Sequence, residues 1–330
     1  MKSFVLIACI LFAGVSSLPV DDTIPRWNAL SDDTGRMKLV DLNPLEVEPE
    51  PMFNPQTDII FLLFTRRNPT VGQRITFDLN TVRNSNWNSN NGVRFIIHGW
   101  QSDQTTALNI FIRDEFLANG DHNVVVVDWS AGAQTINYIS ARNRVGVTGG
   151  TVALLIDDLH RNGLLNFNNV HIVGHSLGSH VAGNAGKQVT RGRIPVIFAT
   201  DPAGPLFSAT DADRLSPNDA IYTEALHTNA GTLGYAEPIT DASFYPNWGS
   251  SQPGCGLDVT GACAHERSNL FYSESVRGTF TARQCANYVQ ITSRNCPGTG
   301  VTGRMGGDVQ KNLSGVFFLT TNSASPFSQG

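Results

Sequence analysis

The chain has 330 residues, of which 41% are hydrophobic and 15% are charged. This composition excludes a disordered chain and a polytopic membrane protein, and it predicts a soluble globular protein with a sizeable core. The formal net charge of -5 weighs against a protein that binds nucleic acid through a broad attraction to phosphates.

The first residues have the order of a secretory signal peptide. Lys2 precedes an apolar run from Phe4 to Val15, and small serines follow it. The run is shorter than the roughly 20 residues that a membrane-spanning helix needs, which weighs against an uncleaved anchor. We therefore expect residues 1–17 to be removed and the protein to be secreted and extracellular.

Residues 18–56 form an acidic, proline-containing segment without apolar periodicity, as in Glu46-Val47-Glu48-Pro49-Glu50-Pro51. Two interpretations stay open for it: an extended N-terminal arm or pro-segment, or an ordered edge strand laid across the body. Apolar runs begin at Ile59, and we expect one domain over residues 57–330.

Short and nearly continuous apolar runs predict buried strands, and this character suits a parallel sheet covered on both faces. Between them, Thr151 to Arg161 has the apolar face of a helix, and Ser179 to Val189 predicts a second, slim helix. The alternation predicts an α/β fold with a mostly parallel central sheet. The predicted strands are Ile59 to Phe64, Val93 to Ile97, Val124 to Val127, Val170 to Val173 and Val196 to Ala199.

Gly174-His175-Ser176-Leu177-Gly178 follows a predicted strand and precedes a predicted helix. It is a Gly-x-Ser-x-Gly turn in the strand-turn-helix context that this motif requires. A tight turn forces strained backbone angles on Ser176, and the flanking glycines remove side chains that would collide there. Ser176 is therefore the predicted nucleophile. We interpret His175 as structural, because alternation along the chain points its side chain elsewhere.

A serine hydroxyl needs a base, and the base needs a group that orients it. Asp201 directly follows the strand Val196 to Ala199, at the edge where α/β sheets place their chemistry. His227 and His265 are the candidate bases. We favour His265, two residues after a cysteine that we expect in a disulfide, and interpret His227 as a strand-end residue with a structural hydrogen bond.

Two backbone amides are the predicted donors to a developing oxyanion. The strand Val93 to Ile97 runs into His98-Gly99-Trp100, and amides that follow such a strand can face the serine. The Leu177 amide lies at the predicted helix N-terminus, where the helix dipole favours negative charge. We assign the Trp100 and Leu177 amides to this role.

The cysteines suit an oxidising compartment. Those beyond the signal peptide allow three pairings, of which we favour the sequential one. Free thiols or a zinc site are the alternative, and the absence of a Cys-x-x-Cys motif from the sequence weighs against it. A metal cluster of His171, His175 and His180 is a further alternative, but it spans a strand, a turn and a helix without usable ligand geometry. The favoured disulfides are Cys255 with Cys263 and Cys285 with Cys296.

Five stretches together resemble the pancreatic lipase family of secreted animal lipases, including its insect members. The resemblance implies an α/β-hydrolase fold and ester hydrolysis on lipids by Ser176, Asp201 and His265. The stretches are Phe95-Ile96-Ile97-His98-Gly99-Trp100, Val173-Gly174-His175-Ser176-Leu177-Gly178, Asp201-Pro202-Ala203-Gly204-Pro205, Phe244-Tyr245-Pro246-Asn247 with Gln252-Pro253-Gly254-Cys255, and Cys263-Ala264-His265-Glu266-Arg267.

The sequence departs from that family in three places. The segment after His265 is too short for the C-terminal β-sandwich that larger members use for a protein cofactor, so we expect neither. Only Gly256 to Ala262 lie where the family has its lid, which resembles the short lids of phospholipase A1 and predicts weak interfacial activation. The stretch Arg214 to Asp219 matches the family's calcium loop, but Ser216 stands where a carboxylate is usual. We therefore expect no metal or other cofactor.

These features predict a secreted serine lipase that acts on glycerolipid at a membrane or lipid interface, either as an sn-1 phospholipase A1 or as a triacylglycerol lipase. A carboxylesterase for small soluble esters is a further candidate. The alternative from another class is a catalytically silent lipid-binding or storage protein that resembles insect yolk proteins. Those relatives lack the nucleophilic serine, whereas Ser176 is present here.

Overall fold

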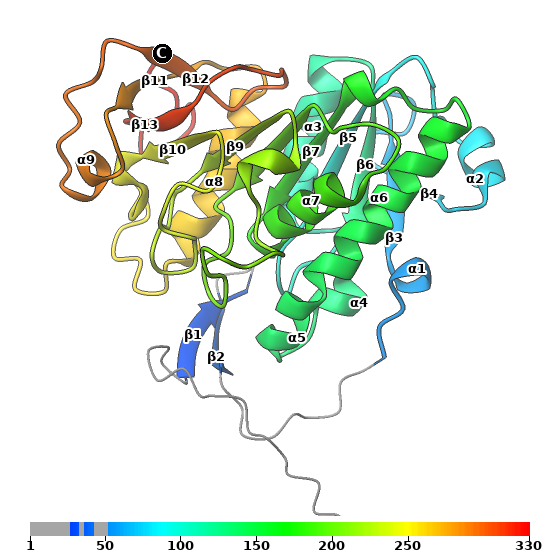
Figure 1. Ribbon diagram of the computed structural model, residues 1–330, viewed down its shortest axis with the longest axis horizontal. Helices are drawn as coiled ribbons and strands as arrows, with labels where there is room; N and C mark the ends of the chain where they lie inside the picture. Colours follow the sequence, from blue (N-terminus) through cyan, green and yellow to red (C-terminus); the bar gives the residue numbers. More distant parts are fainter. Residues whose placement is uncertain (1–26, 33–35, 43–51) are drawn as a thin grey trace, which may run out of the picture.

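The structure is a computed structural model that describes residues 27–32, 36–42 and 52–330, so the predicted signal peptide lies outside the described residues. Its centre is a sheet of eleven strands in the order β12-β11-β13-β10-β9-β8-β7-β5-β6-β3-β4 (Figure 1). The strands of this sheet are β3 Ile60–Phe64, β4 Gln73–Ile75, β5 Gly92–Ile97, β6 His122–Asp128, β7 Val170–His175, β8 Val196–Thr200, β9 Tyr222–Leu226, β10 Ala242–Pro246, β11 Phe280–Cys285, β12 Thr302–Met305 and β13 Gly315–Leu319.

The seven strands from β6 across to β13 are parallel, which confirms the mostly parallel sheet. All five predicted strands are present. The run Ile59 to Phe64 differs in direction, because β3 pairs with β6 antiparallel. A strand buried on both faces is apolar throughout whichever way it runs, so the apolar pattern could not show this direction.

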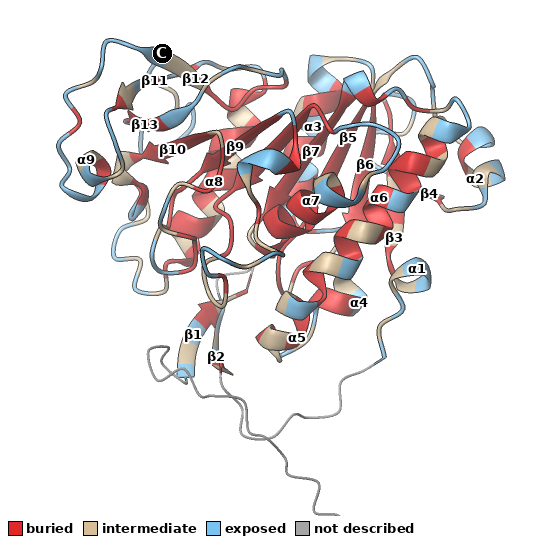
Figure 2. Ribbon diagram, in the orientation of Figure 1, coloured by how far each residue is buried: buried red, intermediate tan, exposed pale blue. Residues whose placement is uncertain are grey.

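Helices cover both faces of the sheet (Figures 1 and 2). α6 and α7 pack together on one face, and α3 and α8 pack together on the other. None of the helices in the described ranges has the length and hydropathy needed to cross a bilayer. The helices are α1 Pro55–Asp58, α2 Leu79–Arg83, α3 Ala107–Asn119, α4 Ser130–Ala133, α5 Tyr138–Asn143, α6 Val145–Arg161, α7 Leu177–Gln188, α8 Ala262–Ser275 and α9 Val289–Thr292, with short 3₁₀ helices at Phe167–Asn169, Pro217–Asp219 and Asn247–Gly249.

The described part of the acidic N-terminal segment forms a hairpin. Its strands, β1 Trp27–Ser31 and β2 Met37–Asp41, pair antiparallel with each other rather than with an edge of the main sheet. Leu30, Val40 and Leu42 are buried against the body of the protein. This part of the segment is therefore ordered across the body, as one of the two interpretations has it, but as a separate two-stranded sheet.

The C-terminal segment continues the central sheet. β13 lies parallel to β10, and β11 and β12 complete that end of the sheet. In the loop before β13, the carboxylate of Asp308 accepts hydrogen bonds from Arg94 Nε at 2.5 Å and His171 Nδ1 at 2.8 Å, and His122 Nε2 lies 3.3 Å away. Because these three residues lie in the first half of their strands, Asp308 lies near the amino-terminal edge of the parallel sheet.

Candidate active site

Ser176 lies in the turn between β7 and α7. Its φ angle is +54°, in the region that non-glycine residues rarely adopt. A Cβ on Gly174 would lie 2.2 Å from the Gly178 carbonyl oxygen, and a Cβ on Gly178 would lie 2.2 Å from the Ile97 carbonyl oxygen. Only glycine fits at either position, and the turn therefore presents Ser176 at the carboxyl edge of the sheet.

Asp201 follows β8 and is fully buried. One carboxylate oxygen, Oδ1, accepts hydrogen bonds from the amides of Thr228 at 2.7 Å and Asn229 at 3.0 Å. A Cβ on Gly234 would lie 2.6 Å from both carboxylate oxygens, so this glycine leaves the space that the carboxylate fills. The two amides hold Asp201 in place and leave Oδ2 for another partner.

That partner is His265, whose Nδ1 lies 2.5 Å from Asp201 Oδ2. His265 lies in the first turn of α8, so a helix fixes its backbone. Burial disfavours the charged ring, but the hydrogen bond and negative charge of Asp201 outweigh it and raise the pKa of His265 above its usual range. The ring is therefore held by its Nδ1 edge and made more basic.

Ser176 and His265 line the same small cavity, together with Gly99 and Trp100. Its volume is about 30 Å³. In the described structure the Ser176 hydroxyl and the His265 ring share this cavity without a direct hydrogen bond. Catalytic hydrogen bonds are often long before substrate binds and shorten in the complex, so the arrangement is compatible with proton transfer between the two groups.

The two predicted oxyanion donors flank the nucleophile. Trp100 lines the cavity, and its indole Nε1 donates to the Thr135 carbonyl at 2.8 Å, which fixes the orientation of the side chain. Leu177 opens α7 directly after Ser176. Within the described ranges, neither the Trp100 nor the Leu177 backbone amide has an intramolecular acceptor. Both amides are thus able to donate to a bound oxyanion.

The prediction that His175 points away from the site is wrong. His175 lines the same cavity as Ser176, and its ring centroid lies 4.5 Å from that of His265. Alternation fails here because β7 ends at His175, and the turn redirects the chain. Burial, with the neighbouring His265 as a smaller influence, lowers the pKa of His175 well below its usual range. A neutral ring therefore packs against His265.

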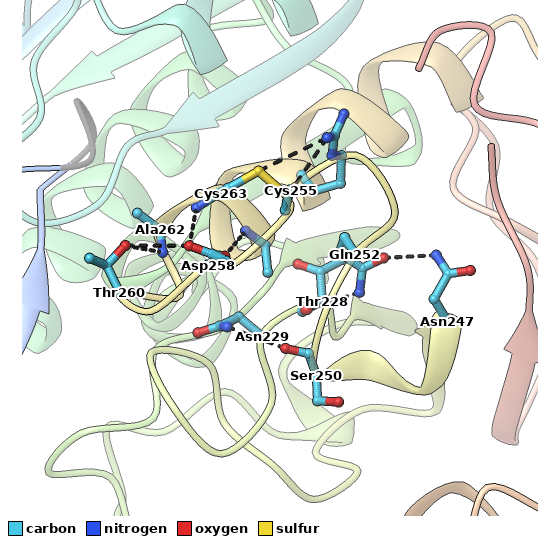
Figure 3. Close-up of a disulfide and its surroundings, with 12 residues drawn as sticks. Thr228, Asn229, Asn247, Ser250, Gln252, Cys255, Asp258, Thr260, Ala262 and Cys263 are labelled. Carbon is cyan, nitrogen blue, oxygen red and sulfur yellow. Dashed lines mark hydrogen bonds between the residues drawn. A yellow bond between two sulfur atoms is a disulfide. The ribbon is translucent and has the colours of Figure 1, made fainter. Parts of the chain in front are cut away.

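The disulfide Cys255–Cys263 closes the loop just before His265 (Figure 3). Inside this loop, Asp258 accepts from the Cys263 amide at 3.3 Å and the Ala264 amide at 2.7 Å, and so caps the start of α8. The second disulfide joins Cys285 and Cys296, so both follow the sequential pairing. The first disulfide and the cap fix the helix turn that carries His265.

The other candidate histidines have structural partners. His227 Nδ1 hydrogen-bonds the Tyr235 carbonyl at 2.9 Å, while its ring stacks on Tyr245. His180 Nε2 bonds the Ala203 carbonyl at 2.9 Å, and burial lowers the pKa of His180 to about 3. His171 belongs to the Asp308 cluster. The structure thus brings His265, and not His227, to the carboxylate of Asp201.

The described residues contain one group of metal-ligating side chains that lie close together, Cys255, Asp258 and Cys263. Its two sulfurs are joined in a disulfide, so they are not available as thiolate ligands.

The stretch that resembles a calcium loop does not fit calcium either. Asp219 accepts from the Ser216 amide at 2.8 Å and from Lys187 Nζ at 2.7 Å. The lysine ammonium already supplies a positive charge to the only carboxylate of that stretch.

The N-terminal hairpin contributes to the site, which was not predicted from the sequence. Leu30, Ser31 and Asp32 line the cavity beside Ser176. The available signal was the turn-forming run Asp33-Thr34-Gly35 between two short segments that contain apolar residues. Such a run predicts a hairpin, but it does not indicate what the hairpin packs against.

The chain is similar to known lipases. A family model described as lipase matches residues 29–327. The pancreatic triacylglycerol lipase of Mus musculus is 35% identical over 92% of this chain and 71% of its own length. That of Myocastor coypus is 33% identical over 92% of this chain and 73% of its own length. Lipase member H of Danio rerio is 34% identical over 81% of this chain and 63% of its own length.

Proposed function

The chain belongs to the lipase family and is a hydrolase of glycerolipid esters, and we propose that it works as a secreted serine lipase through Ser176, His265 and Asp201. The observation that carries this proposal is the Asp201 Oδ2 to His265 Nδ1 contact of 2.5 Å, beside a cavity that His265 shares with Ser176. A carboxylate that holds one edge of the imidazole leaves Nε2 to act as the base.

In the first half of the proposed reaction, Ser176 Oγ attacks the ester carbonyl carbon as its proton passes to His265 Nε2. The negative charge on the carbonyl oxygen is stabilised by the Trp100 and Leu177 amides, because fixed donors in a water-poor site need no reorganisation. The C–O bond to the alcohol then breaks, and the alcohol leaves with the proton from His265. Ser176 is now acylated.

In the second half, water attacks the acyl carbon and gives a proton to His265. The tetrahedral intermediate collapses, the fatty acid leaves, and Ser176 Oγ regains its proton. Asp201 keeps the imidazole in one tautomer and stabilises its positive charge in both halves. The raised pKa of His265 fits this role, because a more basic ring takes the serine proton more readily.

Within the glycerolipids, we propose sn-1 acyl hydrolysis of phospholipid, with triacylglycerol as the second candidate. The short disulfide-bonded loop Gly256 to Ala262 supports the first, because it is too short to cover a deep acyl cleft on its own. The relatives named as triacylglycerol lipases support the second.

The test measures fatty acid release from phosphatidylcholine and from a long-chain triglyceride. Ser176→Ala is expected to lower both rates at least about 10³-fold. Ser293→Ala removes an exposed hydroxyl just after α9 and should keep the parental rate. If Ser176→Ala hydrolyses both lipids as fast as the parent, the nucleophile is misassigned.

We further propose that residues 1–17 are a cleaved signal peptide and that residues 57–330 are the lipase domain of an exported protein. The two disulfides support export, because such bonds persist in oxidising compartments. Recovery of the protein from the culture medium with an N-terminus near residue 18 is the expected result. A chain that stays inside cells with Met1 attached would contradict it.

A further inference from the structure

The N-terminal hairpin forms one wall of the cavity beside Ser176. Leu30, Ser31 and Asp32 line this cavity together with Ser176 and His265. With a volume of about 30 Å³, it has room for a few water molecules at most. While the hairpin is in place, the site therefore has no space for an acyl chain.

A larger pocket also borders the hairpin. Its volume is about 830 Å³, and Asn28 and Leu42 of the hairpin segment line its wall. Phe207, Tyr235 and Ile239 give this pocket an apolar part, whereas Asp211, Arg214 and Glu237 give it a charged part. Pro205 lines both the small cavity and the large pocket. Because both border the hairpin and share Pro205, we expect them to join into one partly apolar groove beside Ser176 when the hairpin leaves.

Side chains, rather than a shared sheet, hold the hairpin in this groove. Leu30 and Val40 are each 3% exposed, and with Leu42 they belong to the apolar cluster that contains Trp100. A polar tie is the hydrogen bond from Lys38 Nζ to Gln101 Oε1 at 2.5 Å. Within the described ranges, β1 and β2 pair only with each other. The hairpin is therefore able to leave without disrupting the central sheet.

The outer face of the hairpin carries exposed apolar side chains. Leu39 is 71% exposed, Trp27 is 53% exposed and Met37 is 39% exposed. Along β2 the side chains alternate, so Leu39 faces outward where its neighbour Val40 faces the groove. The transfer of tryptophan and aliphatic side chains from water to a lipid–water interface lowers the free energy. This outer face therefore fits a lipid surface.

We propose that the hairpin β1–β2 occupies the groove that receives the acyl chain of the substrate, and that a lipid surface draws it out through Trp27, Met37 and Leu39. This proposal rests on Ser176 as the nucleophile. The hairpin supplies the cover for which the loop Gly256 to Ala262 is too short. Weak interfacial activation was expected from the length of that loop alone. With the hairpin as the cover, we expect strong interfacial activation instead.

Two adjacent substitutions test the docking. Val40→Asp places a charge on the buried face, whereas Leu39→Asp places the same charge on the exposed face of the same strand. The readout is the rate at which a fluorophosphonate probe labels Ser176 in the absence of lipid, because that rate follows the fraction of open molecules. We expect Val40→Asp to label about ten-fold faster and Leu39→Asp at the parental rate. Labelling of Val40→Asp at the parental rate would overturn the proposal.

Phosphatidylcholine vesicles test the opening step. They should speed labelling of the parent about ten-fold, leave Val40→Asp unchanged and speed Leu39→Asp much less than the parent. Val289→Asp, on exposed α9 away from the hairpin in Figure 1, should respond as the parent does. A parent that labels equally with and without vesicles overturns lipid-driven opening. So does acceleration confined to chains that mass spectrometry shows to have lost the hairpin.

Hydrogen exchange separates this proposal from the catalytic one. Amides of Met37–Asp41 should be protected in the parent and lose protection in Val40→Asp, whatever the protein catalyses. If exchange follows this pattern but no variant is labelled through Ser176, the proposed nucleophile fails and the docking stands. If Ser176 is labelled but exchange is the same in Val40→Asp and the parent, the docking fails and the nucleophile stands.

Discussion

Two buried aspartates, near opposite edges of the parallel sheet, each bind a histidine, and their surroundings give the two histidines different properties. Asp201 bonds His265 beside the small cavity that Ser176 also lines. Asp308 bonds His171, but it is also paired with Arg94 at 2.5 Å. Arg94 therefore shares the negative charge of Asp308 with His171.

The pKa shifts follow this difference. The pKa of His265 is raised, because the hydrogen bond and charge of Asp201 outweigh the effect of burial. The pKa of His171 is lowered, because burial dominates and the charge of Arg94 offsets part of the effect of Asp308. Burial favours the neutral acid at Asp308, yet the neighbouring His122, the hydrogen bond from His171 and the charge of Arg94 hold the pKa of Asp308 below its usual range. The first pair is suited to proton transfer, and the second to holding the C-terminal segment.

The largest expected effect is on catalysis. Asp201→Asn should lower kcat/KM by roughly 10⁴-fold, because the amide can stabilise the wrong imidazole tautomer and cannot stabilise the imidazolium. Asp308→Asn is the matched control at the other pair and should stay within about three-fold of the parent at a temperature where both are folded. Initial rates on a soluble short-chain ester measure this, and similar losses in both variants would remove the distinction between the two pairs.

The next largest effect is on stability, where we expect Asp308→Asn to be more harmful than Asp201→Asn. Asp308→Asn leaves the buried Arg94 without its carboxylate, and we expect a loss of about 3 kcal/mol in the free energy of unfolding. Urea unfolding of the folded parent and variant measures this loss. A variant as stable as the parent would mean that Asp308 does not hold the C-terminal segment through charge.

The pH dependence sharpens the comparison. A general base must be neutral, and the pKa of His265 is raised. We therefore expect kcat/KM to have a midpoint above pH 6.5 and to fall tenfold for each pH unit below that midpoint. The pKa of His171 is lowered in the folded protein. Its contribution to the free energy of unfolding is therefore present above the unfolded-state pKa of 6.5 and is lost as the pH falls below that value. Activity should therefore decline before the Tm does. A midpoint below 6.5, or parallel losses of both, would contradict this.

The smallest expected effect concerns a third buried carboxylate, Asp219. Lys187 supplies its positive charge at 2.7 Å, so a chelator such as EDTA should leave both the Tm and the hydrolysis rate unchanged. The control adds excess calcium after chelation. A drop in Tm that calcium restores would show that a metal binds despite this ion pair.

Local patterns were enough to predict most of the fold and the identities of the paired site residues. Apolar runs predicted the strands, and the motif around Ser176 needs only its own glycines and the two elements that flank it. Asp201 followed from its place after a strand. The pairing of His265 with Asp201 was harder, because α8 and β8 are far apart in the sequence, and chain order and the nearby cysteine had to supply it.

The failures have one physical cause, which is packing between segments that no local pattern specifies. The direction of β3 depends on its partner β6, and the position of His175 depends on how the chain turns at Ser176. The burial of Leu30 and Val40 depends on a groove built by residues far along the chain. The sequence indicates which residues tend to be buried, but it does not indicate which other residues they pack against.

The central sheet ends in very short strands on both sides. β4 has three residues and β12 has four, whereas the parallel strands between them have five to seven. An unpaired strand is a template on which a second molecule can add a strand of its own, and short edges offer few hydrogen bonds for this. The short strands at the two margins thus limit the edge-to-edge pairing of molecules.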